Sequence, residues 1–416
     1  MSEGRERMSR PDGLTAGVTG GVTGAPVGGL VGAAFALALA SAVSLGLARF
    51  SYALLLPAMR ADLGWSYFTA GLMNTVNAAG YLVGALLLPW LLRRFDARRV
   101  LIAGGASAAL LLALHGAVRS DSALLLLRGA TGMASAASFV AGGLLAARLA
   151  ATAPGRAGLV LGVYYGGTGL GIVAASWLVP PLLMLSPASW AWAWLALGTL
   201  SMLATAWTAV RTRSLSAPPV AGAPHAPIVL QAYAWALAGY LMFGLGYIGY
   251  MTFIVTLLRE QGLSAPVIVA FYSVLGLGVV ASSWLWAGLL QRQRGGVPMA
   301  LLNGLLALAT LLPVLSAHPA VVFVSGALFG SVFLSVVAST TALIRHNAAP
   351  AAWSAGITAF TIVFAAGQII GPGLVGLIAD GSGGGGGLAR GLAWSAAALA
   401  LGSVLAWRQR PLGVAA

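Results

Sequence analysis

Long apolar segments separated by short polar stretches follow one another along the whole chain. The hydrocarbon core of a bilayer is about 30 Å thick, so a helix needs roughly 20 apolar residues to cross it. Twelve segments have this length or come within a few residues of it: 30–56, 68–92, 100–118, 123–147, 159–185, 190–210, 230–257, 266–290, 299–315, 320–344, 352–378 and 388–407. The pattern predicts an all-α membrane protein with twelve transmembrane helices.

Part of the pattern occurs twice. Residues 46–66 align without a gap on residues 244–264, pairing Gly46 with Gly244 and Gly64 with Gly262 at a constant shift of 198 positions. A duplication of this kind is typical of secondary transporters. We therefore expect two six-helix repeats. The predicted parts are a disordered N-terminal tail at 1–29, a bundle at 30–210, a linker at 211–229, a second bundle at 230–407 and a C-terminal tail at 408–416.

Composition excludes a soluble protein. Hydrophobic residues make up 59% of the 416 residues and charged residues 7%, with a mean hydropathy of +0.93, which is more apolar surface than a soluble core can hide. The formal charge of +14 comes from 22 basic residues, all of them arginine, scattered through the gaps between apolar runs, so nucleic-acid binding is not expected. The chain has no cysteine, and it shows no clustered His and carboxylates that would predict an enzyme, a metal site or a cofactor.

The arginines also predict the orientation. If the N-terminus is inside, sixteen arginines fall in cytoplasmic segments and four in outer ones, which agrees with the positive-inside rule. Both termini are then cytoplasmic. The Ala-, Gly- and Arg-rich usage is typical of a high-GC bacterial genome, which predicts a multi-pass protein of the bacterial inner membrane.

Two arginines lie within predicted spans, where a charged side chain costs at least about 2.5–3.5 kcal/mol. Arg49 lies in the first span and Arg128 in the fourth, and all eight carboxylates fall in tails, loops or span edges. Each arginine therefore needs a wet cavity, carbonyl partners or a bound anion. We interpret them as counter-ions for a small organic anion.

Other polar side chains lie at matching depth in neighbouring spans. By helical spacing Asn74, Asn77 and Tyr81 share one face of the second span. The candidates for substrate contact are Arg49, Tyr52, Asn74, Asn77, Arg128, Tyr247, Tyr250 and Gln368. The alternative is that each polar group only bonds a neighbouring helix. A further expectation is a hinge or unwound site at Pro372, which is flanked by glycines in the eleventh span, with a plain kink as the alternative.

Proton coupling has few candidates, because the spans contain no carboxylate. His115 is the one histidine inside a predicted span, and Asp62 and Glu260 lie at span edges. With Arg128 they form the set of candidates for moving a proton.

Four motifs carry a resemblance to a known family. The stretch ARFSYALLLPAMR at 48–60 resembles the YbfB/YjiJ branch of the major facilitator superfamily, and Arg128 through Gly132 resembles the fourth-span Arg-x-x-x-Gly signature. The glycines of the fifth span resemble the hinge-like motif of that span in the superfamily, and the stretch 367–380 resembles the eleventh span of the branch. The loop between the second and third spans departs from the superfamily pattern, because Arg93 and Ala97 stand where Asp and Arg belong.

The resemblance implies the major facilitator fold and alternating access, with Arg49, Arg128 and Tyr247 on helices that line a central cavity. The predicted function is secondary transport of a small organic solute, favouring an anion, in a monomer embedded in lipid. Proton-driven export of lipophilic or drug-like compounds is the alternative, and a non-transporting sensor or scaffold a more distant one.

Overall fold

The computed structural model describes residues 27–186, 188–216, 227–382 and 386–412, and within them it is entirely helical. It contains α1 (Val27–Ser41), the π-helix η1 (Ala42–Phe50), α2 (Tyr52–Leu63), α3 (Tyr67–Arg94), α4 (Ala97–His115), α5 (Asp121–Ala151), η2 (Pro154–Arg156), α6 (Ala157–Leu183), α7 (Trp190–Arg211), η3 (Leu230–Tyr233), α8 (Ala234–Glu260), α9 (Ala265–Leu285), α10 (Ala287–Arg292), α11 (Val297–Leu315), α12 (Pro319–Asn347), η4 (Pro350–Ala352), α13 (Trp353–Asp380) and α14 (Gly387–Trp407). Twelve helical stretches of the described chain are long and apolar enough to cross a membrane, which confirms the predicted number.

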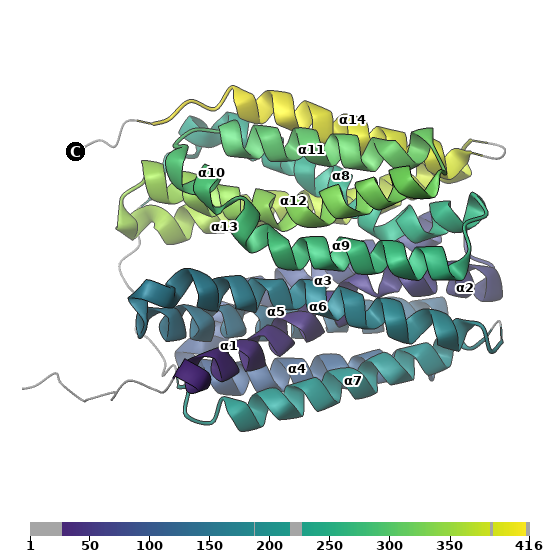
Figure 1. The fold of residues 1–416 in the computed structure, drawn as a ribbon, viewed down its shortest axis with the longest axis horizontal. Helices are drawn as coiled ribbons and strands as arrows, with labels where there is room; N and C mark the ends of the chain where they lie inside the picture. Colours follow the sequence, from purple (N-terminus) through teal and green to yellow (C-terminus); the bar gives the residue numbers. More distant parts are fainter. Residues whose placement is uncertain (1–26, 187, 217–226, 383–385, 413–416) are drawn as a thin grey trace, which may run out of the picture.

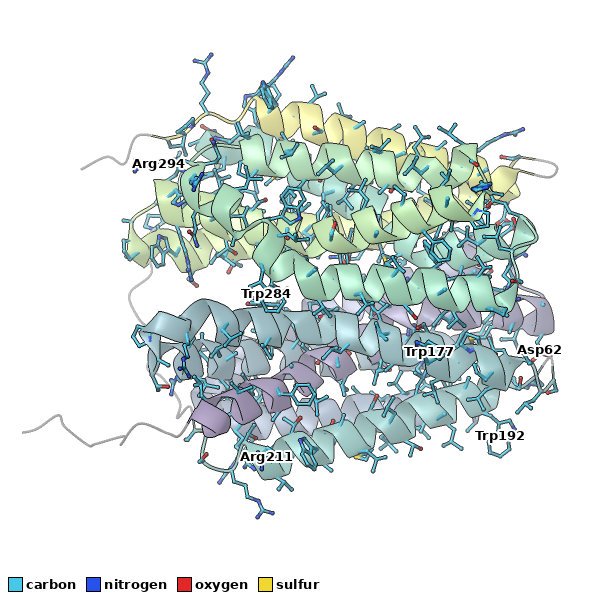
Figure 2. All side chains as sticks on the ribbon, in the orientation of Figure 1. Asp62, Trp177, Trp192, Arg211, Trp284 and Arg294 are labelled. Atoms are coloured by element: carbon cyan, nitrogen blue, oxygen red, sulfur yellow. The ribbon has the colours of Figure 1, made fainter. Side chains whose placement is uncertain are left out.

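The helices form two groups, α1–α7 and α8–α14, that lie side by side with their axes roughly parallel (Figure 1). We call the end that carries Arg211 and Arg294 the basic end, and the end that carries Asp62 the opposite end (Figure 2). The limits proposed for bundles, linker and tails stay predictions. Residues 1–26, 217–226 and 413–416, which hold most of the N-terminal tail and parts of the linker and C-terminal tail, lie outside the described residues.

The internal repeat has a structural counterpart at the opposite end. Gly64 and Gly262 both adopt the left-handed conformation, with φ of 69° and 81°, directly after α2 and α8. A residue without Cβ is favoured there, because the conformation strains other side chains. Ser66 and Ser264 then occupy the N-cap positions of α3 and α9. The same turn therefore leads out of the first span of each half.

The first span differs from its repeat partner by a π-helix. Residues Ala42–Phe50 form η1, whereas α8 is α-helical throughout. Gly46 lies in η1 so close to α6 that an added Cβ would be 2.6 Å from the Gly171 Cα. Short π-helical stretches are often found at functional sites, and this one contains Arg49.

Several hydrogen bonds between the two groups lie in the opposite half of the molecule, such as that from Asn74 of α3 to Thr252 of α8. A Cβ added at Gly71 of α3 would lie 2.3 Å from the carbonyl oxygen of Pro372 in α13. The helix α13 continues through Pro372 without interruption, so the expected hinge is not an unwound segment. In α8, residues 243–258 are buried on every side, whereas its basic-end half is partly exposed. The described protein is therefore closed at the opposite end.

Candidate substrate site

Arg49 lies at the boundary between the two groups of helices. Its guanidinium donates a hydrogen bond to Oε1 of Gln368 in α13, and the hydroxyl of Tyr247 in α8 donates to the same oxygen over 3.0 Å. Arg49 and Tyr247 occupy equivalent positions of the repeat, so one glutamine joins both first spans. The side chain of Arg49 is 5% exposed.

The donors of Arg49 are not all used. Its Nε is buried without a hydrogen-bond partner among the described residues. Its guanidinium carbon lies 5.7 Å from the ring centre of Tyr81 and 6.0 Å from that of Phe50, distances typical of cation–π contacts. Arg49 is therefore a buried cation with neutral partners and an unused donor, an arrangement that is costly unless a further partner compensates the charge.

Arg128 in α5 is held differently, by oxygens of its own half. Its Nε donates to the Met73 carbonyl over 3.4 Å, one terminal nitrogen to the Ala48 carbonyl over 3.2 Å and the other to Asn74 Oδ1 over 2.9 Å. Its guanidinium carbon also lies 4.7 Å from the ring centre of Tyr52. Because Ala48 precedes Arg49, Arg128 holds the backbone of η1 in place.

Neither membrane arginine has an acidic partner among the described residues. The one salt bridge found there joins Arg119 and Asp62 at the opposite end. Carbonyl and amide oxygens therefore compensate the charge of Arg128 through partial charges only. Removing each cation from water costs several kcal/mol even after relaxation. Because no negative charge in the described part of the chain compensates the two cations, the potential around them is positive and favours an anion.

The remaining predicted contacts divide into groups. Asn74 also donates to Thr252 Oγ1 of α8 over 2.7 Å, which links the halves, while Asn77 donates to the Arg128 carbonyl over 3.0 Å. Tyr52 donates to the Ala70 carbonyl over 2.9 Å inside its own half.

Tyr250 lies apart from both arginines. Its hydroxyl is 2.7 Å from Ser325 Oγ, and its ring stacks on Phe329 with 4.0 Å between centres. The structure thus brings together Arg49, Tyr247 and Gln368 in one cluster and Arg128, Tyr52, Asn74 and Asn77 in a second, adjoining one.

The candidates for proton coupling are dispersed. His115 is buried with its ring stacked 4.6 Å from Trp194, and its Nδ1 is 2.7 Å from the Leu111 carbonyl oxygen. Asp62 is bound by Arg119 and accepts a hydrogen bond from Trp190 Nε1 over 2.7 Å. Glu260 accepts a hydrogen bond from the Tyr67 hydroxyl at the opposite end.

Sequence reasoning left three residues of this interface outside its candidates: Tyr81, Thr252 and Asp380. Tyr81 shares a helix face with Asn74, which was a usable signal. Thr252 carries none, because its repeat partner is a leucine. The carboxylate of Asp380 accepts from the backbone N–H groups of Tyr67 over 2.9 Å and Phe68 over 2.8 Å. The sequence shows that Asp380 is a charged residue at the edge of a span, but it does not show that this residue contacts the start of α3.

Comparison with known proteins decides the family. The model of the family described as uncharacterised MFS-type transporter YbfB matches residues 41–407. The chain belongs to this YbfB-type family. Its fold is that of major facilitator transporters, which are not enzymes, and such a transporter has a small-molecule substrate and a lipid environment.

Solved structures share the fold of this YbfB-type chain at low sequence identity. A bacterial homologue of the human lysosomal transporter Spinster, in an inward-facing and unoccupied conformation, superposes with a TM-score of 0.70 at 14% identity, covering 92% of this chain and 97% of that one. The nucleoside transporter NupG superposes with a TM-score of 0.69 at 14% identity, covering 91% and 100%. No curated protein matches the sequence.

Proposed function

We propose that this YbfB-type protein is a secondary active transporter that moves a small organic anion across the bacterial inner membrane by alternating access. Arg49 is the group that binds the anion. The observation that carries the proposal is that Arg49 is buried between the halves with a neutral partner, Gln368, and an unused Nε donor. We further propose that the protein acts as a monomer with both termini in the cytoplasm.

The chemistry of the Arg49 cluster supports an anion. A carboxylate carries a full negative charge and can accept two parallel hydrogen bonds from a guanidinium, whereas the Gln368 amide is neutral and offers Arg49 one oxygen. An entering carboxylate therefore displaces the Gln368 amide oxygen from Arg49. Tyr247 then remains as a second donor, to Gln368 or to the substrate.

This exchange couples binding to movement. The bond between Arg49 and Gln368 joins η1 of one half to α13 of the other. A ligand that replaces it removes a contact between the two halves, and differential contacts of this kind are what allow a ligand to shift a conformational equilibrium. Rocking of the two halves about the site then exposes it to either side of the membrane.

Arg128 acts in this proposal through position and charge. Its three hydrogen bonds to Met73, Ala48 and Asn74 occupy all its nitrogens, so it fixes the backbone that carries Arg49. Its second positive charge raises the potential at the site. Protons, if they are coupled, use Arg128, His115, Asp62 or Glu260, or travel with the substrate.

One observation favours the second candidate function, proton-driven export of lipophilic compounds. Next to the Arg49 cluster, Tyr240, Phe243 and Tyr247 of α8 stack with Phe364 at ring-centre distances of 4.9, 5.2 and 5.5 Å. Such a stack also provides an apolar surface for a lipophilic substrate.

Transport by purified protein in vesicles distinguishes the two functions. We expect Arg49→Gln to lower the apparent affinity for an organic anion about 10- to 100-fold, from about 1.5–3 kcal/mol for a charged hydrogen bond. Arg49→Lys, which keeps the positive charge, should retain part of the affinity for the anion. Arg390→Gln is the matched control, because Arg390 is exposed near the start of α14. Unchanged anion transport by Arg49→Gln, or export of lipophilic cations alone, would exclude the anion site.

A further inference from the structure

A groove opens on the membrane-facing surface between α3, α4 and α5, toward the basic end. Its volume is about 410 Å³. Small side chains of α4 and α5 form its floor, since Gly104 lies so near α5 that an added Cβ would be 2.7 Å from the Ser138 nitrogen. Larger apolar side chains form its walls. The lining includes Leu91 and Phe95 at the end of α3, Arg99, Ala103 and Ser107 of α4, and Met133 of α5.

One charged residue lines this groove, and it lies at the membrane interface. Arg99 is the third residue of α4, a helix of 19 residues, Ala97–His115, whose length of about 28 Å matches the hydrocarbon core. Arg99 is exposed, and no hydrogen bond or ion pair engages its guanidinium among the described residues. The groove extends from Arg99 to Ser107, about 12 Å along the helix. It thus combines an interfacial cation with an apolar channel.

The charge around Arg99 is positive. Arg93 and Arg94 are exposed at the end of α3, and the Arg94 guanidinium lies 4.4 Å from the ring centre of Trp90. The neighbouring acid, Asp96, caps α4 by accepting from the Arg98 nitrogen over 2.8 Å, and it also accepts from Ser216 Oγ over 2.8 Å. The local excess of arginine complements an anionic headgroup.

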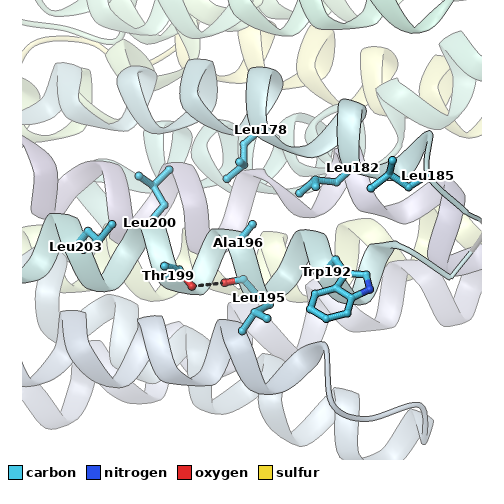
Figure 3. A pocket seen from close by; sticks show the side chains of 9 residues that line it. All are labelled: Leu178, Leu182, Leu185, Trp192, Leu195, Ala196, Thr199, Leu200 and Leu203. Carbon is cyan, nitrogen blue, oxygen red and sulfur yellow. Dashed lines mark hydrogen bonds between the residues drawn. The ribbon is translucent and has the colours of Figure 1, made fainter.

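A second membrane-facing groove provides the contrast. It lies between α6 and α7, has a volume of about 620 Å³ and is lined by Trp192, Thr199 and seven aliphatic side chains (Figure 3). The hydroxyl of Thr199 donates to the Leu195 carbonyl over 2.9 Å. With no charged residue in its lining, this groove offers nothing to select one headgroup over another.

We propose that the groove between α3, α4 and α5 binds an anionic phospholipid, with the phosphate at Arg99 and an acyl chain along Ala103 and Ser107. Basic pockets between transmembrane helices are suited to anionic headgroups, and the apolar channel selects a lipid over a free phosphate ion. The site faces the bilayer and is independent of the transported substrate. It fixes α4 against α3 and α5 within one half of the transporter.

The test is lipid retention by the purified full chain. Protein is equilibrated in micelles with equal amounts of phosphatidylglycerol and phosphatidylcholine of the same acyl chains, and retained lipids are counted by native mass spectrometry. We expect phosphatidylglycerol to be preferred, and Arg99→Gln to lower the preference about fivefold, from about 1 kcal/mol per basic side chain. Ala103→Phe, which fills the channel at an exposed position, should lower phosphatidylglycerol retention with every charge intact.

Two control variants match these changes. Arg156→Gln removes an exposed arginine of the basic end that does not line the groove, and Thr199→Phe fills the other groove. Both should leave the preference unchanged. Equal retention of the two lipids by the unmodified protein, or equal losses in Arg99→Gln and Arg156→Gln, would overturn the proposal. Displacement of phosphatidylglycerol by inorganic phosphate would identify an anion site rather than a lipid site and would overturn it as well.

Discussion

Asp380 joins the two halves at the opposite end, and its replacement should shift that end toward an open state. Its two carboxylate oxygens accept hydrogen bonds from the backbone N–H groups of Tyr67 and Phe68, over 2.9 and 2.8 Å. These groups lie in the first turn of α3, where a helix has no partners of its own for its N–H groups. Asp380 ends α13, so the contact joins the two halves and exists only while their opposite ends meet.

The magnitude follows from this geometry. An acidic group at a helix N-terminus contributes about 0.3–1 kcal/mol, and a hydrogen bond contributes about 1 kcal/mol. Asp380→Asn removes the charge and one of the two acceptors, a loss of about 1–2 kcal/mol. We therefore expect the ratio of open to closed opposite ends to rise about 5- to 30-fold, since 1.4 kcal/mol is a factor of ten.

The assay uses the absence of cysteine from the sequence. Spin labels at Met184→Cys and Ala317→Cys report the distance between the two halves, because both positions are exposed, at the ends of α6 and α11 that lie on this side. Electron–electron double resonance then gives the populations. Asp121→Asn is the matched control: Asp121 lies at the same end but accepts from Trp65 Nε1 over 2.7 Å, within one half.

A distance distribution that is the same for Asp380→Asn and the unmodified protein would refute the reasoning. So would an equal shift in Asp121→Asn, because the effect would then arise from charge at this end and not from the contact between the halves.

Three further predictions test the packing and the two arginine clusters. Gly71→Ala places a methyl group 2.3 Å from the Pro372 carbonyl oxygen, so the same spin-label distance should lengthen; an unchanged distance would contradict the close approach of α3 and α13. Arg128→Lys keeps the charge but loses the fork that binds three acceptors, and should destabilise the protein by about 1.5–3 kcal/mol in thermal unfolding. Equal melting temperatures of Arg128→Lys and the unmodified protein would contradict a role of these three hydrogen bonds in stabilising the fold. Tyr247→Phe should weaken substrate binding, whereas Tyr250→Phe should lower stability by about 1 kcal/mol and leave transport unchanged; the reverse result in a transport assay would exchange their assignments.

Much of the architecture could be predicted because it depends on local patterns. Apolar length fixes the number of spans, and the glycines at positions 64 and 262 mark the same left-handed turn in both halves. The absence of carboxylates from the spans predicted that Arg49 and Arg128 would need other partners. These features depend on composition and spacing, which a single sequence contains.

Contacts between distant residues were not predictable. The sequence left an unwound site or a plain kink at Pro372 as alternatives, and α13 remains helical through that residue. The sequence did not indicate the π-helix of the first span, where Gly46 packs on Gly171. Helical spacing grouped Tyr81 with Asn74, yet Tyr81 lies beside Arg49 while Asn74 contacts Arg128. The position of the π-helix and the partners of Tyr81 and Asn74 depend on which helix packs against each of these residues, and a single sequence does not show this.

The most direct test of the central claim is a thermal-shift screen of the purified protein against small carboxylates and lipophilic cations. A ligand at a hundred times its dissociation constant stabilises the folded state by about 2.7 kcal/mol. We predict that one or more carboxylates stabilise the unmodified protein and Arg390→Gln but not Arg49→Gln. Stabilisation by lipophilic cations alone, or carboxylate stabilisation that persists in Arg49→Gln, would contradict an anion site at Arg49.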